Sequence, residues 1–378
     1  MHDFTLKEIT NTDITKELET VGFDKSYIFK GVEKFEYKNI KIFSLTPAQA
    51  NIVKQTAISV GCDCATHREV ITGKIEKSDC IVGGSISQIK KIAKKLQYQP
   101  FGLKVLGESL DNLVNVKKSA KTKIVGILNL TENSFSDGGL YNTFDKACEH
   151  LMQMIDEGAD IIDIGAESTK PYSSAVDDKT QLEKLIPVIE FAKGKIPISI
   201  DTRSSVVAEK CIQAGADIIN DVSGFDYDKN MADVAARYGK KVIIQHSKGT
   251  PDIMQNAPTY SNLVDEIFFS LKQKIDFALS KGINKENIIF DVGIGFGKTR
   301  KDNFELIKRI EEFYSLGCPV MLGVSRKSLL DMADEDNFTK DIFTVALNAF
   351  AVEHKVDYIR VHNVELHRKL LSMLEMFN

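Results

Sequence analysis

The chain has 378 residues and a formal net charge of −4, with 43% hydrophobic and 27% charged residues. This length favours one large domain with a smaller one beside it. The mixed charges argue against a nucleic-acid partner, and the absence of an apolar run long enough to span a bilayer argues against a membrane protein. Residues 1–13 lack the basic and apolar regions of a signal peptide, so we expect a cytoplasmic protein.

Residues 1–118 are predicted to form a small α/β domain. Its pieces are the segment KIFSLTP at 41–47, a helical stretch at 48–61, an apolar segment at 79–84 and a basic helix at 85–97. We interpret the lysines of the basic helix as a solvated face rather than a site for an anionic partner: Lys90, Lys91, Lys94 and Lys95. The apolar periodicity fades in 106–123, which is therefore predicted to be the junction between the domains.

The cysteines indicate reduced thiols in a core rather than a disulfide framework, because they are scattered along the chain: Cys62, Cys64, Cys80, Cys148, Cys211 and Cys318. Together with His67, the first three could imitate a metal cluster. Their spacing is a poor match to a zinc site, so we do not favour metal binding there.

From residue 123 onwards the chain repeats one unit, which consists of a β-branched run, a polar loop and an amphipathic helical stretch. The predicted strands are 123–130, 161–165, 198–201, 218–221, 241–245, 288–291, 319–324 and 358–362. Helical stretches such as 143–158 and 302–317 lie between them and close on glycine. These eight units predict a (β/α)8 TIM barrel over 119–378. An open doubly wound sheet is the alternative, but its glycine-rich first turn is absent.

Nearly every predicted strand ends in a polar residue, and in such a barrel the strand ends build the active site. These residues are Asn129, Glu167, Asp201, Asn220, Asp221, Gln245, His246, Asp291, Arg360 and His362. A ring of carboxylates and carboxamides suits a flat, nitrogen-rich heterocycle such as a pterin, whose amide and amidine edges they satisfy. The alternative is that some of them cap helices.

The seventh strand runs into GVSRKSLL (323–330), which would bring Arg326 and Lys327 to the same mouth and begin a helix near Ser328. Cations beside a helix N-terminus suit an anion. With Arg360 and His362 they could hold a diphosphate, and Asn129 could ligate a Mg2+ ion that bridges its oxygens. In DVGIGFGKT (291–299) the glycines allow close backbone approach, and Phe296 could cover an aromatic ring.

The polar loop within GILNLTENSFSDGG (126–139) completes a set of motifs that resembles the dihydropteroate synthase family across residues 123–378. The other segments are IIDIGAESTKP, SIDTR, IINDVSG, DVGIGFGK, GVSRKS and RVHNV, in the order and rough spacing of that family. The resemblance implies that 6-hydroxymethyl-7,8-dihydropterin diphosphate condenses with p-aminobenzoate to give 7,8-dihydropteroate and diphosphate. It further implies a homodimer formed through barrel helices and competition by sulfonamides.

The resemblance also implies a role for each matching residue. The pterin ring would be bound by Asp201, Asn220, Asp291, Lys327 and Phe296. The diphosphate would be held by Asn129, Arg360, His362 and Thr169, with Asn129 on Mg2+. The p-aminobenzoate would be held by Phe135, Lys170, Pro171 and Ser328. The catalytic groups would be Asp137, Lys327 and Asp201.

Some positions depart from the family pattern. Glu132 and Asn133 stand where Pro and Asp are usual, and Lys170 stands where Arg is usual and would lose a planar, bidentate fork. Gln245 replaces a common Met, and Asn363 a common Asp. Two alternatives are a methyltetrahydrofolate-dependent methyltransferase, which needs no diphosphate site, and a pterin-binding paralogue without catalysis. Lys327, Arg360, His362 and the SFSDGG loop favour the synthase over the methyltransferase.

Overall fold

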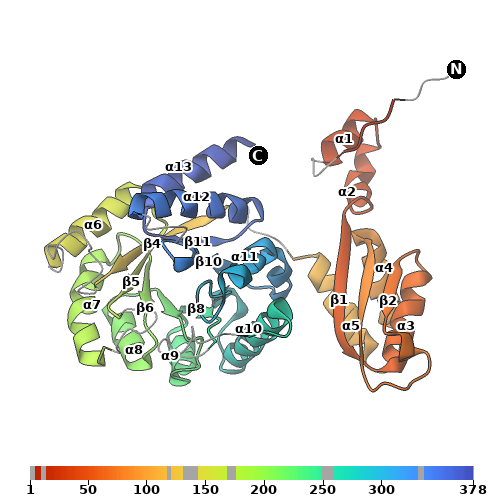
Figure 1. The fold of residues 1–378 in the computed structure, drawn as a ribbon, viewed down its shortest axis with the longest axis horizontal. Coiled ribbons are helices and arrows are strands. Elements are labelled where there is room, and N and C mark those ends of the chain that lie inside the picture. The colour runs from red at the N-terminus through yellow and green to blue at the C-terminus, as the bar shows by residue number, and fades with distance from the viewer. Residues whose placement is uncertain are drawn as a thin grey trace. The chain divides into compact units, whose positions relative to one another are not determined.

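The computed structural model describes residues 5–9, 14–116, 121–130, 144–167, 176–248, 259–330 and 336–377. The chain divides into two compact units, Met1–Lys117 and Lys118–Asn378 (Figure 1). Each unit has its own hydrophobic core. None of the described helices is long and apolar enough to cross a membrane.

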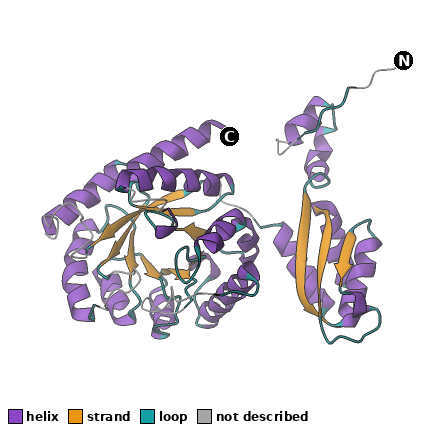
Figure 2. Ribbon diagram, in the orientation of Figure 1, coloured by secondary structure: helices purple, strands orange, loops and turns teal. Residues whose placement is uncertain are grey.

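The N-terminal unit is built on an antiparallel sheet with the strand order β1-β3-β2, formed by Tyr37–Leu45, Ser78–Ser85 and Asp63–Thr66 (Figure 2). Its helices are α1 (Ile14–Thr20), α2 (Ile28–Val32), α3 (Pro47–Ile58), α4 (Ile86–Leu96) and α5 (Leu103–Val114). Alternate residues of β1, such as Ile40 and Ile42, are buried in a core with Val53 and Ile89. This α/β arrangement follows from the period-2 and helical patterns.

Helix α5 corrects the predicted junction at 106–123. Leu103, Leu106 and Leu110 recur at helical spacing and pack on the core of the N-terminal unit. Gly107 lies between them, and a Cβ atom there would be 2.5 Å from the backbone oxygen of Ala93 on α4. The glycine therefore permits two helix backbones to approach closely, which the fading hydrophobicity of the sequence did not reveal.

Gly107→Ala is expected to destabilise the N-terminal unit. Alanine gains about 1 kcal/mol in helix propensity, but contact with a backbone oxygen forces α4 and α5 apart, and such overpacking costs about 1 to 3 kcal/mol. Hydrogen exchange in the amides of these two helices should become faster, while the barrel amides keep their rates. Glu108→Ala, an exposed change one residue along the same helix, is the control, and equal exchange in the two variants would contradict the expectation.

The cysteines of the chain are all free thiols. Within the described residues no group of three or more His, Cys, Asp or Glu side chains is placed to hold a metal ion. Of the lysines on the basic helix, Lys91, Lys94 and Lys95 are exposed, and Lys90 pairs with Glu33 at 2.5 Å. The interpretation of α4 as a helix with a solvated lysine face is therefore confirmed.

The C-terminal unit is a closed parallel barrel of eight strands surrounded by helices, as predicted (Figures 1 and 2). The strands are β4 (Lys123–Asn129), β5 (Ile161–Gly165), β6 (Ile198–Asp201), β7 (Ile218–Asp221), β8 (Lys241–Gln245), β9 (Ile288–Asp291), β10 (Val320–Leu322) and β11 (Tyr358–Val361). The barrel closes where β10 pairs with both β9 and β11. The seventh strand is shorter than predicted, and the others match within one residue.

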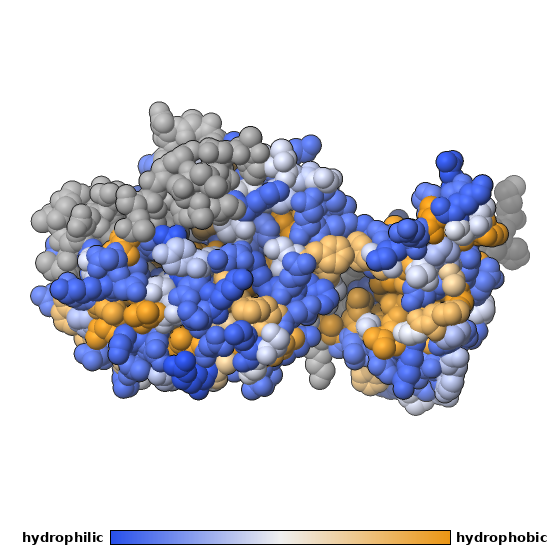
Figure 3. Space-filling model, turned by 90° about the horizontal axis from the view of Figure 1, so that it is seen from below, coloured by the Kyte–Doolittle hydropathy of each residue, from blue (hydrophilic) through white to orange (hydrophobic). Residues whose placement is uncertain are grey.

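The helices of the barrel alternate with its strands. They are α6 (Phe144–Asp156), α7 (Asp178–Ala192), α8 (Ser205–Ala214), α9 (Asn230–Tyr238), α10 (Leu263–Ser280), α11 (Arg300–Lys308), α12 (Asn337–Glu353) and α13 (Val364–Leu374). The predicted helix at 302–317 is divided into α11 and a 3-10 helix, Ile310–Leu316. On the face shown in Figure 3 the barrel is mostly hydrophilic, with scattered hydrophobic residues between, as expected for helices that bury only one side.

The interior of the barrel has an apolar layer formed by one residue from each of seven strands: Val125, Ile161, Ile218, Ile243, Ile289, Met321 and Tyr358. Side chains two residues further along a strand point the same way. In this chain most of those positions are polar, namely Asp163, Asn220, Gln245, Asp291 and Arg360. The interior of the barrel is therefore filled by apolar side chains in one layer. The next layer, at the carboxyl ends of the strands, is lined by polar groups.

Candidate functional site

Arg360 on β11 pairs with two of the carboxylates that line the mouth of the barrel. Its Nε donates to Asp163 Oδ2 at 2.6 Å and its Nη2 donates to Asp201 Oδ2 at 2.8 Å. Asn220 Nδ2 donates to the same oxygen of Asp163 at 2.9 Å. One carboxylate on β5 thus joins the predicted diphosphate residue Arg360 to the predicted pterin residue Asn220.

Asp163 was missing from the predicted site because it lies inside a strand rather than at its end. It is fully buried, as is Ser199 beside it on β6. A charged residue in the apolar run IIDIG is the signal that points to it, because burying a carboxylate is costly unless it is paired. Asp163 Oδ1 and Asn220 Oδ1 are buried and have no hydrogen-bond partner among the described residues. These oxygens remain available as acceptors in the mouth of the barrel.

Burial raises the pKa of the Asp201 carboxyl from 3.8 to about 7, while the nearby Arg360 acts to lower it and Asp163 to raise it further. Burial likewise raises the pKa of Asp291, against the opposing effect of Lys327. Buried carboxyls with a raised pKa occur both at functional sites and in structural networks, so the convergence of these groups at one mouth, rather than the pKa, supports a site.

Asp201→Asn is expected to change how stability depends on pH. The folded protein binds the Asp201 proton more tightly than the unfolded chain does, so this group stabilises the fold most at low pH, and the contribution is lost as the pH rises through about 7. The free energy of unfolding of the variant, relative to the wild type, should therefore increase between about pH 5 and pH 8. Urea denaturation at several pH values measures this, and parallel pH profiles for the two proteins would contradict it.

Lys327 follows β10, which is the neighbour of β11 in the barrel, so it lies on the same side of the mouth as Arg360. Its Nζ donates to the backbone oxygen of Ile294 at 2.5 Å and lies 4.7 Å from the centre of the Phe296 ring. Burial lowers its pKa to about 8, and Asp291 opposes the shift. A Cβ atom at Gly323 would lie 3.6 Å from Asp291 Oδ2 and 3.9 Å from Lys327 Nζ. The predicted pterin residues Asp291, Lys327 and Phe296 are therefore brought together around a space that a glycine keeps open.

Asn129, at the end of β4, lies on the Asp201 side of the mouth. A Cβ atom at Gly165 would be 3.3 Å from Asp201 Cβ and 3.6 Å from Asn129 Oδ1. Asn129 is partly exposed, and its side chain has no hydrogen bond to a described residue. Mg2+ commonly takes one or two protein oxygens and completes its coordination with phosphate oxygens and water. The free carboxamide oxygen of Asn129 fits that donor set.

His362 follows β11, and its Nδ1 lies 2.9 Å from Ser325 Oγ, which also accepts from the His362 backbone N–H at 3.1 Å. Ser325 is buried. It follows β10, so the two loops are tied together next to Arg360. His362 is thus oriented by a neighbouring strand rather than lying free in solvent.

The structure corrects one expectation about the mouth. Arg326 turns away from Lys327 and forms a bidentate pair with Asp341 on α12, with both contacts at 2.8 Å. The backbone of Arg326 is left-handed, with φ of 54°, and this sends the two side chains in different directions. Ser328 is exposed and begins a 3-10 helix, which spans Ser328–Leu330 in the part of the chain that the structure describes.

Two other polar strand ends have structural partners. Glu167 forms a bidentate pair with Arg203, at 2.8 and 3.1 Å. Asp221 accepts from the backbone N–H groups of Ser223 and Phe225, which closes the turn after β7. Burial raises the pKa of Asp221. Neither residue caps a described helix: Glu167 is held in an ion pair and Asp221 in a turn.

The predicted catalytic residue Asp137 lies outside the described residues. So do the predicted substrate contacts Phe135, Thr169, Lys170 and Pro171. Their assigned roles remain predictions.

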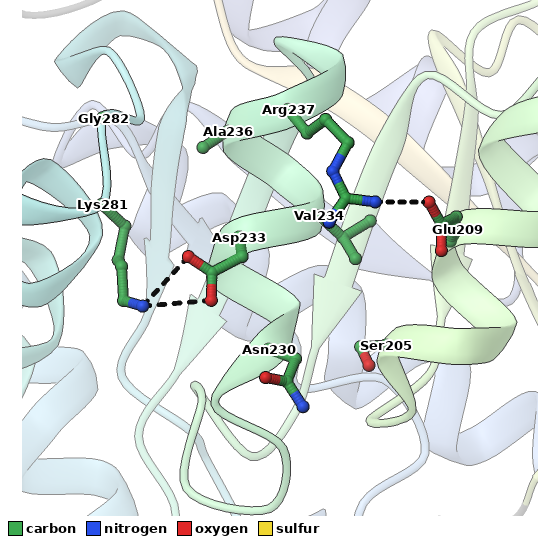
Figure 4. Close-up of a pocket in the computed structure, with 9 residues that line it drawn as sticks. All are labelled: Ser205, Glu209, Asn230, Asp233, Val234, Ala236, Arg237, Lys281 and Gly282. Carbon is green, nitrogen blue, oxygen red and sulfur yellow. Dashed lines mark hydrogen bonds and ion pairs between the residues drawn. The ribbon is translucent and has the colours of Figure 1, made fainter.

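A hollow lies on the outside of the barrel between α8, α9 and the end of α10 (Figure 4). Lys281 contacts both carboxylate oxygens of Asp233 at 3.0 Å, and Arg237 pairs with Glu209 at 2.7 Å. These four charges satisfy one another on the protein surface, in contrast to the open acceptors in the barrel mouth. We assign the candidate site to the mouth.

Comparison with known proteins agrees with this assignment. Residues 125–362 match the family model described as pterin binding enzyme. The dihydropteroate synthase of Clostridium beijerinckii is 40% identical over 262 residues, which are 68% of this chain and 94% of that protein.

The chain belongs to the dihydropteroate synthase family.

Members of this family are transferases. A crystal structure of the dihydropteroate synthase from Clostridium difficile in the presence of pteroic acid is 38% identical, with a TM-score of 0.64, and the match covers 69% of this chain and 98% of that one. The Xanthomonas albilineans dihydropteroate synthase with 4-aminobenzoic acid is 33% identical, with a TM-score of 0.64, over 68% of this chain and 93% of that one.

Some dihydropteroate synthase relatives are longer. A probable bifunctional folylpolyglutamate synthase/dihydropteroate synthase of Haloferax volcanii is 33% identical over 341 residues, so the chain spans 40% of that relative's length. The match covers 84% of this chain. The barrel unit starts only at Lys118, so the similarity also extends into the N-terminal unit.

Proposed function

We propose that the barrel condenses 6-hydroxymethyl-7,8-dihydropterin diphosphate with p-aminobenzoate and releases 7,8-dihydropteroate and diphosphate. The observation that carries the proposal is the convergence of two buried carboxylates, a carboxamide and a lysine at one barrel mouth, next to an arginine. These groups are Asp201, Asp291, Asn220, Lys327 and Arg360.

Recognition of the pterin follows from the hydrogen-bonding capacity of the site. A pterin has adjacent N–H donors on its amidine edge and a carbonyl acceptor on its amide edge. The carboxylates and the free Asn220 Oδ1 accept from the donors, and Lys327 donates to an acceptor. An analogue that lacks these polar edges would leave buried groups unpaired, at a cost of about 1 to 3 kcal/mol for each.

Binding of the diphosphate is assigned to the side of the mouth that carries Arg360, His362 and Asn129. The guanidinium of Arg360 is planar and can contact phosphate oxygens while its other nitrogens stay on Asp163 and Asp201. When Mg2+ is bound, held by Asn129 and by the diphosphate itself, it neutralises charge on the leaving group.

The reaction breaks the bond between the pterin methylene carbon and the diphosphate oxygen, and a new carbon–nitrogen bond forms to the aniline nitrogen. Arg360 and His362 stabilise the negative charge that develops on the leaving oxygen. The electron-rich pterin ring, fixed by Asp201, Asp291 and Lys327, delocalises the positive charge left on the methylene. The aniline nitrogen loses one proton after attack, and we assign its acceptance to Asp137 of the first loop.

The purified chain, mixed with the pterin diphosphate, Mg2+ and p-aminobenzoate, is expected to release diphosphate and form dihydropteroate. Omitting p-aminobenzoate should abolish dihydropteroate formation, and sulfonamides should compete with it. Tight binding of the pterin diphosphate without any release would identify a binding paralogue instead. Methyl transfer from methyltetrahydrofolate would identify the methyltransferase alternative.

The place of action and the assembly of the protein are part of the same proposal. We assign the protein to the cytoplasm and expect a homodimer formed through barrel helices, on the basis of the family resemblance. We expect no nucleic-acid and no membrane partner. Light scattering of the purified chain at several concentrations measures the dimer, and a constant monomer mass would contradict it.

A further inference from the structure

Lys298 is a buried lysine in the loop after β9, and the proposed reaction gives it no role. It is only 2% exposed. Its Nζ donates to the backbone oxygens of Gly293 and Phe296, at 2.8 and 2.9 Å, and contacts His246 Nδ1 at 2.9 Å. Within the part of the chain that the structure describes, it forms no salt bridge with a carboxylate. Burial lowers the pKa of Lys298 to about 7, so below that pH its ammonium donates to two carbonyls of its own loop and to one imidazole.

His246, which follows β8, can accept a hydrogen bond from this lysine. Burial, together with the charge of Lys298, lowers its pKa to about 2, so the ring is neutral. A neutral ring has one nitrogen that accepts a hydrogen bond, and Lys298 makes Nδ1 that nitrogen. The lysine thus ties the loop after β9 to the end of the neighbouring strand β8.

The loop around Lys298 has a conformation that needs support. Gly293, Gly295 and Gly297 all have positive φ, between 64° and 84°. A Cβ atom at Gly293 would lie 1.8 Å from the backbone oxygen of His246. Such a backbone costs chain entropy, so its path must be held by contacts. Val292 and Ile294 are fully buried in the barrel core, and the Tyr260 hydroxyl donates to the Gly297 backbone oxygen at 2.8 Å. Lys298 adds the contacts that hold the carbonyls of Gly293 and Phe296.

The fixed loop carries the residues that meet the pterin. Between the two carbonyls bound by Lys298 lies Ile294, whose backbone oxygen accepts from Lys327 Nζ. Phe296 presents its ring to the same Nζ, and the Gly293 backbone N–H donates to Asp291 Oδ1 at 2.7 Å. A shift of this loop would therefore change a contact of each of the three proposed pterin residues Lys327, Phe296 and Asp291.

We propose that Lys298 is a positioning residue for the pterin subsite, which acts through the loop 292–298 to set Lys327, Phe296 and Asp291 against the pterin ring. The inference rests on the proposed function, because the proposed ligand of this subsite is the pterin of that reaction. It predicts a selective effect. The p-aminobenzoate contacts are assigned to other loops, so a loosened loop after β9 weakens one substrate and spares the other.

The test compares Lys298→Met with the wild type by calorimetric binding of the pterin diphosphate and by the two KM values. We expect the Kd and KM for the pterin diphosphate to rise about tenfold or more, while the KM for p-aminobenzoate stays within about twofold. A purely structural lysine would instead lower the active fraction and leave both KM values unchanged. A wild-type Kd for the pterin diphosphate in the variant overturns the proposal.

Lys274→Met is the matched control. Lys274 is also a buried lysine that donates to loop carbonyls, of Ser223 and Gly224, at 2.9 and 2.6 Å, and unlike Lys298 it pairs with a carboxylate, Asp226, at 2.6 Å. Its loop makes no described contact with Lys327, Phe296 or Asp291. This variant is expected to lose stability and to keep the pterin KM within about twofold, and a rise equal to that of Lys298→Met would overturn the selectivity argument.

Asn303→Ala keeps the proposal testable if Lys298→Met does not fold. Asn303 Oδ1 accepts from the Gly295 backbone N–H at 2.8 Å and so anchors the same loop from α11. We expect a smaller rise in the pterin KM, about threefold to tenfold, with the KM for p-aminobenzoate unchanged. A wild-type pterin KM in this variant would overturn the role of the loop. Failure of the wild type itself to bind the pterin diphosphate or release its diphosphate would refute the proposed function instead.

Discussion

Lys327→Ala is expected to lower kcat/KM for the pterin diphosphate by about a hundredfold to a thousandfold, which is the usual effect of removing one preorganised charged donor. The donor is fixed before any ligand arrives, because its Nζ is bound by the Ile294 backbone oxygen and lies over the Phe296 ring. Asp291 faces the same space. Alanine would leave that carboxylate without its nearest cation, so both the pterin and the charge balance of the pocket are affected.

The pH profile gives a second measure of Lys327. Its pKa is lowered to about 8 by burial, so the free enzyme should lose the protonated donor as the pH rises through that value. We expect kcat/KM of the wild type to fall above about pH 8. Lys308→Ala, an exposed change on α11, should leave both the rate and the profile unchanged. Wild-type turnover in Lys327→Ala would show that the pterin site has been assigned wrongly.

The fold was predictable because hydrophobic periodicity and strand length suffice to indicate a closed barrel. Residues two apart on a strand share a face, so the alternation of polar and apolar residues places the polar strand ends at one mouth. Asp201, Asn220 and Asp291 were found in this way. Helix α5 was missed because its close approach to α4 depends on the absence of a single Cβ at Gly107.

Other parts of the site depend on backbone direction, which the sequence does not reveal. Arg326 and Lys327 are adjacent cations, yet the left-handed backbone at Arg326 sends one to Asp341 and leaves the other in the mouth. Asp163 and Lys298 were missed because neither of them closes a strand. Both are buried charges in apolar surroundings, and that property alone would have been a reason to consider them.

Asp163→Ala is expected to lower the free energy of unfolding by about 3 to 5 kcal/mol, as for other buried ion pairs that lose one partner. Arg360 would keep a carboxylate only at Asp201, and the Asn220 amide would lose its acceptor. Activity should also be lost, because the hydrogen bond from Asn220 Nδ2 to Asp163 is what leaves Asn220 Oδ1 free to face the pterin. Urea denaturation and diphosphate release measure the two effects.

Two further variants separate the charge of Asp163 from its geometry. Asp163→Asn can keep an oxygen where Oδ2 lies and accept from both donors, so it should be less destabilised than the alanine variant. Adding Arg360→Met to Asp163→Ala removes the cation that the first change leaves underpaired, and the double variant should be more stable than Asp163→Ala alone. Additive losses in this pair would mean that the two residues do not depend on each other. Activity should not return in the double variant, because Arg360 is also proposed to bind the diphosphate. Recovered turnover would show that Arg360 does not have that role.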